Sequence, residues 1–196
     1  MLSDGYHAVP PGKVAVVITQ LEMRAPQLRG ATLPDGLTFV EITPDVATYR
    51  DLFRRVGEDW LWYGRTLLSD ADLAQILDDP DTRHFTLMHE GQSEALLELD
   101  FREDGACELT YFGLTSKLIG KGAGAYLMDR AMQCAFDKPI KRFHVHTCTI
   151  DSQQALAFYQ RSGFRPVLQK IEIADDPRLH HGYDRRLAPH VPIIDP

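Results

Sequence analysis

The sequence predicts an α+β fold, a three-layer α/β arrangement in which helices flank a mixed, mostly antiparallel central sheet. Three observations predict it. Two runs rich in β-branched residues, 13–23 and 37–43, read as strands near the start of the chain. Three more strand-like runs follow one another across short Gly-containing turns, as in an antiparallel meander. Strand and helix signals then alternate, which is typical of a mixed sheet covered by helices.

Capping residues or an apolar face indicate the helices. Pro44-Asp45 opens the first, and Ser69 caps the second. The fourth is expected over 152–162, with Gly163 as its C-cap. In the third, apolar residues recur at i, i+4, i+7 and i+8, which gives one buried face: Leu127, Ala131, Cys134 and Ala135.

The remaining strands are expected to complete one sheet, at 84–89, 95–102, 107–115, 142–149 and 165–174. With 196 residues and 44% hydrophobic content, the chain can bury one core, and no linker separates two cores. One domain is therefore expected over residues 1–196. Within it, 13–43 supplies N-terminal strands, and 175–196 is expected to be an irregular, Pro- and His-rich tail.

The formal net charge of −7 argues against general affinity for nucleic acid or an anionic membrane, because both depend on clustered positive charge. The charge is uneven. Residues 115–142 hold six basic and two acidic side chains, so this segment carries +4 and the remainder −11. A basic neighbourhood in an acidic protein favours an anionic ligand there, although solvated lysines on a helix face explain part of it.

Cysteine usage indicates a reducing compartment. Cys107, Cys134 and Cys148 are odd in number and form no CxxC pair, so neither a disulfide framework nor a zinc knuckle is expected. His144, His146 and Cys148 share one face of a strand, but two His and one Cys make an incomplete ligand set, and we expect no metal. No apolar run reaches transmembrane length, and no secretion signal opens the sequence, so the cytoplasm is the expected location.

Three glycines at alternate positions lie between a strand-like run and a strongly helical run. Glycine lets the backbone approach a ligand, and a helix N-terminus offers unpaired N–H groups with partial positive charge. A pyrophosphate is the natural guest, and a ligand-free tight turn is the alternative. The turn consists of Ile119, Gly120, Lys121, Gly122, Ala123, Gly124 and Ala125.

Two motifs together carry a resemblance to a known family. Residues 111–124 (YFGLTSKLIGKGAG) resemble the acetyl-CoA-binding strand, turn and helix of the GNAT acetyltransferases. Residues 152–164 (SQQALAFYQRSGF) resemble that family's second signature, Asn-x-x-Ala-x-x-hydrophobic-Tyr-x-x-x-Gly-Phe. Their order and spacing agree, and the resemblance covers residues 37–174. Ile119 stands where the family prefers Arg or Gln, and Ser152 replaces the usual Asn.

The resemblance implies a GNAT-like acyl-CoA N-acyltransferase fold that uses acetyl-CoA and no metal. Its strands would splay, and the pantetheine arm would pair with the open edge. Gly113 would permit a bulge there. Besides the glycine turn, the implied cofactor contacts are the backbone of Phe112, Gly113 and Leu114, together with Ser152, Ala155 and Phe158; core packing is the alternative for the Phe112 and Leu114 side chains.

The resemblance implies further roles, which the chemistry of amine acetylation requires. Tyr159 is the expected general acid for the departing thiolate, with a core aromatic as the alternative. Glu108 is the first choice of base, directly or through water, and Glu98 and Asp100 are alternatives. For each of the three carboxylates, a solvated surface position is the other interpretation. His146 is a possible base or substrate contact. Residues expected to contact the acceptor are Trp60, Trp62, Glu98 and His146, with core packing the alternative for at least one Trp.

The expected reaction is direct attack of a primary amine on acetyl-CoA in a ternary complex. The acceptor stays open between a small amine, an amino acid, an aminoglycoside and a protein N-terminus. A monomer and a homodimer are both compatible with the sequence. Two other functions also stay open: a non-catalytic acyl-CoA sensor or interaction module, and an acyltransferase that uses a longer acyl-CoA.

Overall fold

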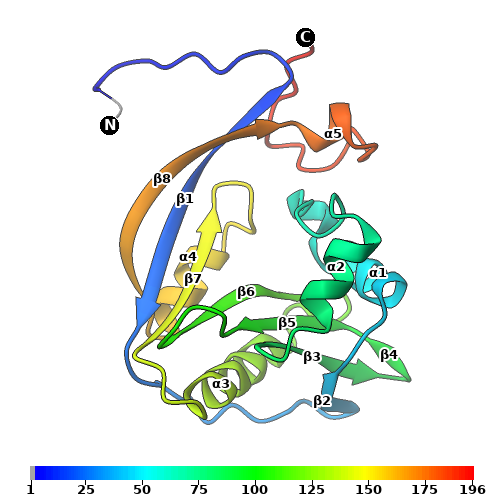
Figure 1. Ribbon diagram of the computed structural model, residues 1–196, viewed down its shortest axis with the longest axis vertical. Coiled ribbons are helices and arrows are strands. Elements are labelled where there is room, and N and C mark those ends of the chain that lie inside the picture. Colours follow the sequence, from blue (N-terminus) through cyan, green and yellow to red (C-terminus); the bar gives the residue numbers. More distant parts are fainter. Residues whose placement is uncertain (1–2) are drawn as a thin grey trace.

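An open sheet dominates the computed structural model, which describes residues 3–196 (Figure 1). Its strands are β1 (Lys13–Met23), β2 (Leu37–Ile42), β3 (Thr82–His89), β4 (Gln92–Ser93), β5 (Ala95–Asp100), β6 (Ala106–Leu114), β7 (Arg142–Cys148) and β8 (Arg165–Asp175). They are ordered β2-β3-β5-β6-β7-β1-β8, with β4 paired to β3. Within the described chain β6 and β7 are parallel and the other pairs antiparallel, so the predicted mixed, mostly antiparallel sheet is confirmed.

Helices cover the sheet on two sides. They are α1 (Val46–Gly57), a 3-10 helix (Glu58–Trp60), α2 (Asp70–Leu77), α3 (Ala123–Phe136), α4 (Ala155–Arg161) and α5 (Pro177–His180). The α3 helix contributes its predicted apolar face to a core with Leu97 and Leu99 of β5. The α1 and α2 helices form a second core against Leu96, on the other face of the same strand. None of the helices in residues 3–196 is both long and apolar enough to span a bilayer.

The two predicted N-caps are confirmed, whereas the fourth helix differs from the prediction at both ends: its C-cap is Ser162, and Gly163 follows with φ of 98°. Asp45 accepts a hydrogen bond from the Thr48 N–H, and Ser69 accepts one from the Asp72 N–H. The fourth helix, α4, begins at Ala155 rather than at residue 152. Its N-cap, Gln154, makes no side-chain capping hydrogen bond, and residues 152–155 form a turn that is closed by a bond from the Ala155 N–H to the Ser152 carbonyl.

The tail is more ordered than predicted. Asp176 caps α5, with Pro177 at the first helical position, where a missing N–H costs nothing. The Asp176 carboxylate binds the buried Arg178 guanidinium. That guanidinium also donates from Nη1 to the carbonyls of Leu187, Ala188 and Val191. A buried arginine therefore fixes the path of residues 181–191, although they lack regular secondary structure.

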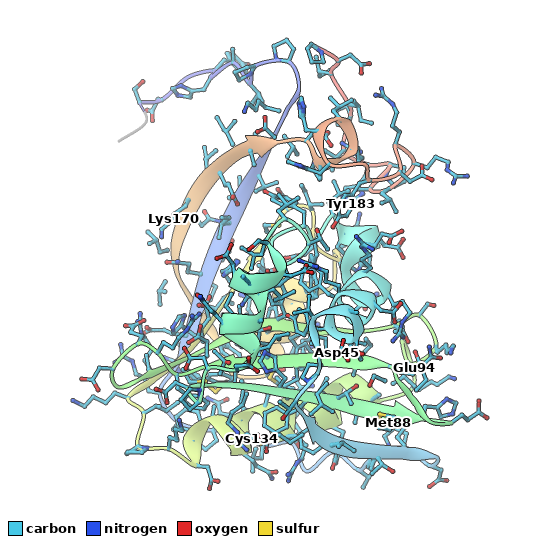
Figure 2. The ribbon with its side chains drawn as sticks, turned by 45° about the vertical axis from the view of Figure 1, so that its right-hand side comes forward. Asp45, Met88, Glu94, Cys134, Lys170 and Tyr183 are labelled. Carbon is cyan, nitrogen blue, oxygen red and sulfur yellow. The ribbon has the colours of Figure 1, made fainter. Side chains whose placement is uncertain are left out.

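The sheet opens in its middle. Residues 106–108 of β6 pair with 142–144 of β7, and beyond them the two strands part. Past that point β7 continues beside β1, which pairs along its whole length with β8. The β1–β8 ribbon rises from the rest of the sheet (Figure 1), and Lys170 lies on its outer strand (Figure 2). This parting leaves one side of residues 109–114 without a neighbouring strand.

A bulge lies on β6, but not at Gly113 as expected. Glu98 faces Tyr111 and Leu99 faces Leu109, so Thr110 is the extra residue. Gly113 is needed for a different reason. A Cβ atom there would lie 2.4 Å from Cγ1 of Val56 on α1, so the strand and helix can approach only because position 113 has no side chain.

Candidate active site

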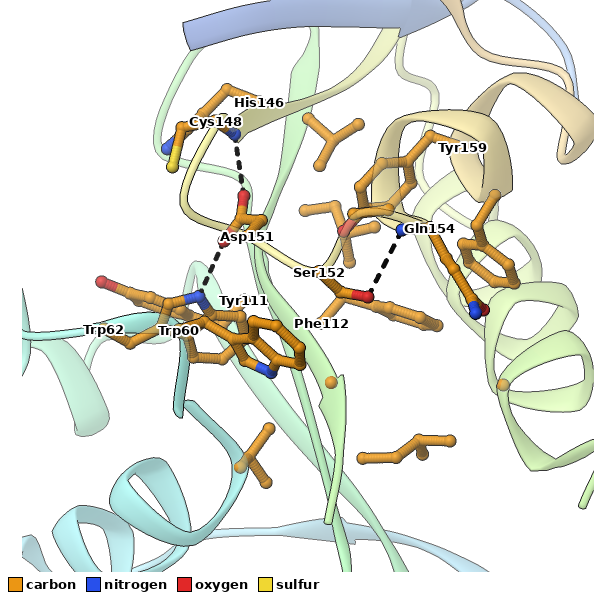
Figure 3. A pocket seen from close by; sticks show the side chains of 18 of the residues that line it. Trp60, Trp62, Tyr111, Phe112, His146, Cys148, Asp151, Ser152, Gln154 and Tyr159 are labelled. Atoms are coloured by element: carbon orange, nitrogen blue, oxygen red, sulfur yellow. Dashed lines mark hydrogen bonds between the residues drawn. The ribbon is translucent and has the colours of Figure 1, made fainter. Parts of the chain in front are cut away.

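The parted strands form one wall of a cavity of about 480 Å³ (Figure 3). Residues 109–114 of β6, which include the bulge residue Thr110 and Gly113, form the floor of the cavity. The loop 60–64 forms a second wall, and the end of β7 with α4 forms a third. Of the predicted site residues, those that line this cavity are Trp60, Trp62, Phe112, Gly113, Leu114, Ile119, Gly120, Gly124, His146, Ser152, Ala155, Phe158 and Tyr159.

The glycine turn lies at the mouth of the cavity and leads into α3. Gly120 and Gly122 have φ of 79° and 82°, in the left-handed region that favours glycine. Gly122 is the N-cap and has no side chain that could cap the helix, so the N–H groups of Ala123 and Gly124 have no partner within α3, whereas the Ala125 N–H donates to the Gly122 carbonyl. A Cβ atom at either glycine would meet no atom within 4 Å, so the space above the turn is open. Lys121, Gly122, Ala123 and Ala125 shape this turn without lining the cavity itself.

Tyr159 brings the second motif to the cavity. Its ring lies among Phe112, Phe158 and Phe164, with centroids 5.8 to 6.3 Å away, and its side chain is 7% exposed. Phe158 stacks on Phe112 at 5.6 Å, which joins α4 to β6. Burial, with a smaller contribution from the charge of Asp151, raises the pKa of Tyr159 well above its ordinary value. The hydroxyl therefore stays protonated at neutral pH.

Glu108 does not line the main cavity. It borders a second hollow with Asp100 and His144 on the neighbouring strands. Its Oε1 lies 3.3 Å from Nδ1 of His146, and His146 does line the main cavity. This hydrogen bond, partly opposed by burial, raises the pKa of His146 and is the main cause of a lowered pKa at Glu108. Any effect of Glu108 on the cavity therefore passes through the imidazole.

Asp151 fixes the aromatic wall and was missed by the sequence reading. Its Oδ1 accepts a hydrogen bond from Trp62 Nε1 at 3.0 Å (Figure 3). Its Oδ2 accepts from Thr147 Oγ1 at 2.7 Å and from the Cys148 N–H at 2.8 Å. The carboxylate thus connects the loop 60–64 to the end of β7. Its only sequence signal is its place directly before the second motif.

Glu98 was expected to contact the acceptor, and the structure places it elsewhere. Its side chain is fully buried on the central strand β5, outside the main cavity. It accepts a hydrogen bond from the Tyr49 hydroxyl at 2.5 Å, pairs with Arg65, and lies 3.5 Å from His84 Nε2. Burial alone would raise the pKa of Glu98, but His84 and the charge of Arg65 lower it below its ordinary value. The alternative base Asp100 pairs with Arg102.

The Arg65 guanidinium lies 5.2 Å from the centre of the Tyr111 ring, which lines the cavity. Through Arg65, the buried Glu98 carboxylate thus supports the part of the cavity wall that Tyr111 forms. Within residues 3–196, no three His, Cys, Asp or Glu side chains lie close enough together to hold a metal ion.

Comparison with known families identifies the fold. The acetyltransferase (GNAT) family matches residues 47–164, more than half of the chain, and includes both motifs. The chain belongs to this family. The resemblance drawn from the two motifs is therefore confirmed, and so is the expected acyl-CoA N-acyltransferase fold.

Individual relatives are distant. An uncharacterized protein, YxbD, from Bacillus subtilis (strain 168) is 31% identical over 111 residues, which are 55% of this chain and 61% of the relative. A GCN5-related N-acetyltransferase from Kribbella flavida is 19% identical, with a TM-score of 0.57. The match covers 87% of this chain and 63% of the Kribbella chain. An aminoglycoside acetyltransferase from an uncultured soil metagenomic sample, in complex with sisomicin, is 14% identical, with a TM-score of 0.55. The match covers 66% of this chain and 88% of the aminoglycoside acetyltransferase chain. The chain thus spans less than two thirds of several relatives.

Proposed function

We propose that this GNAT protein transfers the acetyl group of acetyl-CoA to a primary amine by direct attack in a ternary complex. One observation carries the proposal: the glycine turn, the unpaired edge of β6 and Tyr159 all meet at one cavity. The turn at the start of α3 suits the pyrophosphate, because the N–H groups of Ala123 and Gly124 begin the helix without a carbonyl partner inside it, and the space above Gly120 and Gly122 is open. The unpaired edge of residues 109–114 suits the amide groups of the pantetheine arm.

In the proposed reaction the amine nitrogen attacks the thioester carbonyl carbon, and the C–S bond breaks as the tetrahedral intermediate collapses. Main-chain N–H groups near Leu114 would stabilise the oxyanion. The Tyr159 hydroxyl would donate its proton to the departing CoA sulfur, whose proton affinity rises in the same apolar surroundings. His146, with Glu108 behind it, would accept the proton that the amine loses, directly or through water.

The walls of the cavity favour an amine on an apolar body. Trp60, Trp62 and Tyr63 line the cavity, and the ring of Tyr111 lies 5.2 Å from that of Trp62. Rings of this kind bind alkyl and aromatic groups and attract ammonium groups. Glu172 of β8 also lines the cavity and adds negative charge. Among the open acceptor classes, this composition favours a small alkyl- or arylamine over a heavily hydroxylated one.

Two measurements test the proposal in sequence. Calorimetry should detect binding of acetyl-CoA, and release of free CoA thiol should follow when a panel of amines is added. Arylalkylamines should give higher kcat/KM than an aminoglycoside. Binding without thiol release from any amine would favour the acyl-CoA sensor, and faster turnover with longer acyl-CoA would favour the long-chain transferase. If acetyl-CoA does not bind, the proposal fails.

The pH dependence of kcat/KM should report His146. A base must be neutral, so activity should rise with pH through the pKa of His146, which Glu108 raises above 6.5. Glu108→Gln removes the hydrogen-bonded charge that favours the imidazolium, and the acidic limb should therefore move to lower pH. Glu103→Gln is the matched control, because Glu103 lies beside His144 instead and should leave the limb in place. An unchanged limb in Glu108→Gln would remove His146 from the assignment.

A further inference from the structure

The strand β8 is an exposed edge of the sheet. It ends the strand order and pairs only with β1. Ten of its eleven residues are exposed, and Ala174 is half-buried. Figure 1 shows β8 as the outer border of the ribbon, with α4 near its first residues and α5 after its last. In the described chain, residues 3–196, no other segment pairs with its outer side, so a run of main-chain N–H and C=O groups faces solvent.

Two hydrogen bonds fix which residues present these groups. The Val17 N–H donates to Thr149 Oγ1, at the β7 side of β1. Val17 therefore does not bond to its partner Ile171, and the N–H and C=O of Ile171 point outward. The Asp176 N–H bonds to the Gly12 carbonyl, which continues the same alternation. The outward groups thus belong to Gln169, Ile171, Ile173 and Asp175.

This outer edge is complementary to itself. Pro166, which has no N–H, limits it at one end, and Asp176, the cap of α5, limits it at the other. The nine residues between them are centred on Ile171. Lys170 and Glu172 flank this centre. In an antiparallel pair of two such strands centred on Ile171, Lys170 of each copy faces Glu172 of the other.

The geometry of such a pair suits these side chains. Lys170 and Glu172 would occupy positions without main-chain bonds between the copies, where opposed side chains approach most closely. On the other face of the ribbon, apolar side chains are exposed on both strands: Val17 is 37% exposed, Ile171 53% and Ile173 52%. Edge strands that stay unpaired are usually protected by charges or bulges along their length. Here the two charges at the centre of the edge, Lys170 and Glu172, have opposite signs and alternate with the exposed β-branched residues Ile171 and Ile173.

We propose that β8 pairs antiparallel with β8 of a second copy of this chain, across a two-fold axis at Ile171, so that two sheets become one. A second copy fits better than an unrelated partner, because the same strand running in the opposite direction places Glu172 against Lys170 and Lys170 against Glu172. The pairing also reaches the cavity. Glu172 lines it, so Lys170 of the partner subunit would stand beside the cavity wall.

Single cysteines test the register. In the proposed dimer the two copies of residue 171 are about 5.5 Å apart between Cα atoms, within disulfide range. Ile171→Cys should therefore give a covalent dimer with added diamide, which takes up the two electrons and two protons of the thiols. Ile173→Cys is the matched control: it is equally exposed on the same face, but its two copies would lie roughly 13 Å apart, four residues along the pair. Equal cross-linking of both variants, or of neither, would overturn the proposal.

Charge reversal tests the same pairing without a cross-link. Sedimentation velocity should find the wild-type chain as a dimer. Lys170→Glu and Glu172→Lys each create two like-charge contacts and should weaken dimerisation at least tenfold, while the double reversal should restore it. The melting temperature of the monomer checks that each variant folds. A monomeric wild-type chain, or a double reversal no better than either single change, would contradict the proposed interface.

Discussion

Tyr159→Phe is expected to lower kcat by about 10²- to 10⁴-fold, the usual contribution of a positioned general acid. The ring would remain among Phe112, Phe158 and Phe164, so packing and acetyl-CoA affinity should change little. Only the proton for the departing thiolate would be lost. Steady-state kinetics of thiol release, with calorimetry of acetyl-CoA binding, measure the two effects separately.

Tyr126→Phe is the matched control for this experiment. Tyr126 lies on α3, with its ring 6.3 Å from Phe39, and does not line the cavity. Loss of its hydroxyl should leave kcat unchanged. If Tyr159→Phe also leaves kcat unchanged, Tyr159 is a core aromatic residue, as its burial alone would permit. The melting temperatures of both variants show whether any loss of turnover comes from unfolding.

Local patterns predicted most of the fold. The β-branched run at 13–23 became β1 with the expected bounds, and Asp45 and Ser69 cap α1 and α2. Such signals are read from neighbouring residues, because strand alternation and capping act over a few positions. The glycine turn was recognisable for the same reason, since its residues are consecutive. The start of α4 was predicted three residues too early, because no capping side chain marks its actual start at Ala155.

The supports of the cavity could not be read in this way, because they join residues far apart in sequence. Trp62 and Asp151 are 89 positions apart, and Arg65 and Glu98 are 33 apart. The need for glycine at 113 comes from Val56 on another element. A carboxylate such as Glu98 normally indicates an exposed position. Glu98 is buried because it lies on β5, a central strand that helices cover on both faces.

Arg65→Met should lower the free energy of unfolding by about 3–5 kcal/mol, because it leaves the Glu98 carboxylate buried without its charged partner. Glu98 is fully buried, and the Arg65 side chain is 12% exposed. Urea unfolding at pH 7 measures the loss. Arg83→Met is the control: Arg83 pairs with Glu41, whose side chain is 51% exposed, and a pair of that kind contributes about 1 kcal/mol or less.

The pH dependence of this deficit identifies its cause. In the wild-type protein the pKa of Glu98 is lowered, so the stability it contributes is present above its unfolded pKa and is lost as the pH falls through the folded value. Without Arg65, burial raises the pKa of Glu98 and the carboxylate takes up a proton more readily. The deficit of Arg65→Met should therefore shrink as the pH falls from 7 towards 5. Adding Glu98→Gln should recover much of the stability at pH 7, since it removes the unpaired charge. A deficit that is constant with pH and unaffected by Glu98→Gln would mean that Arg65 stabilises the fold through its packing on Tyr111 instead.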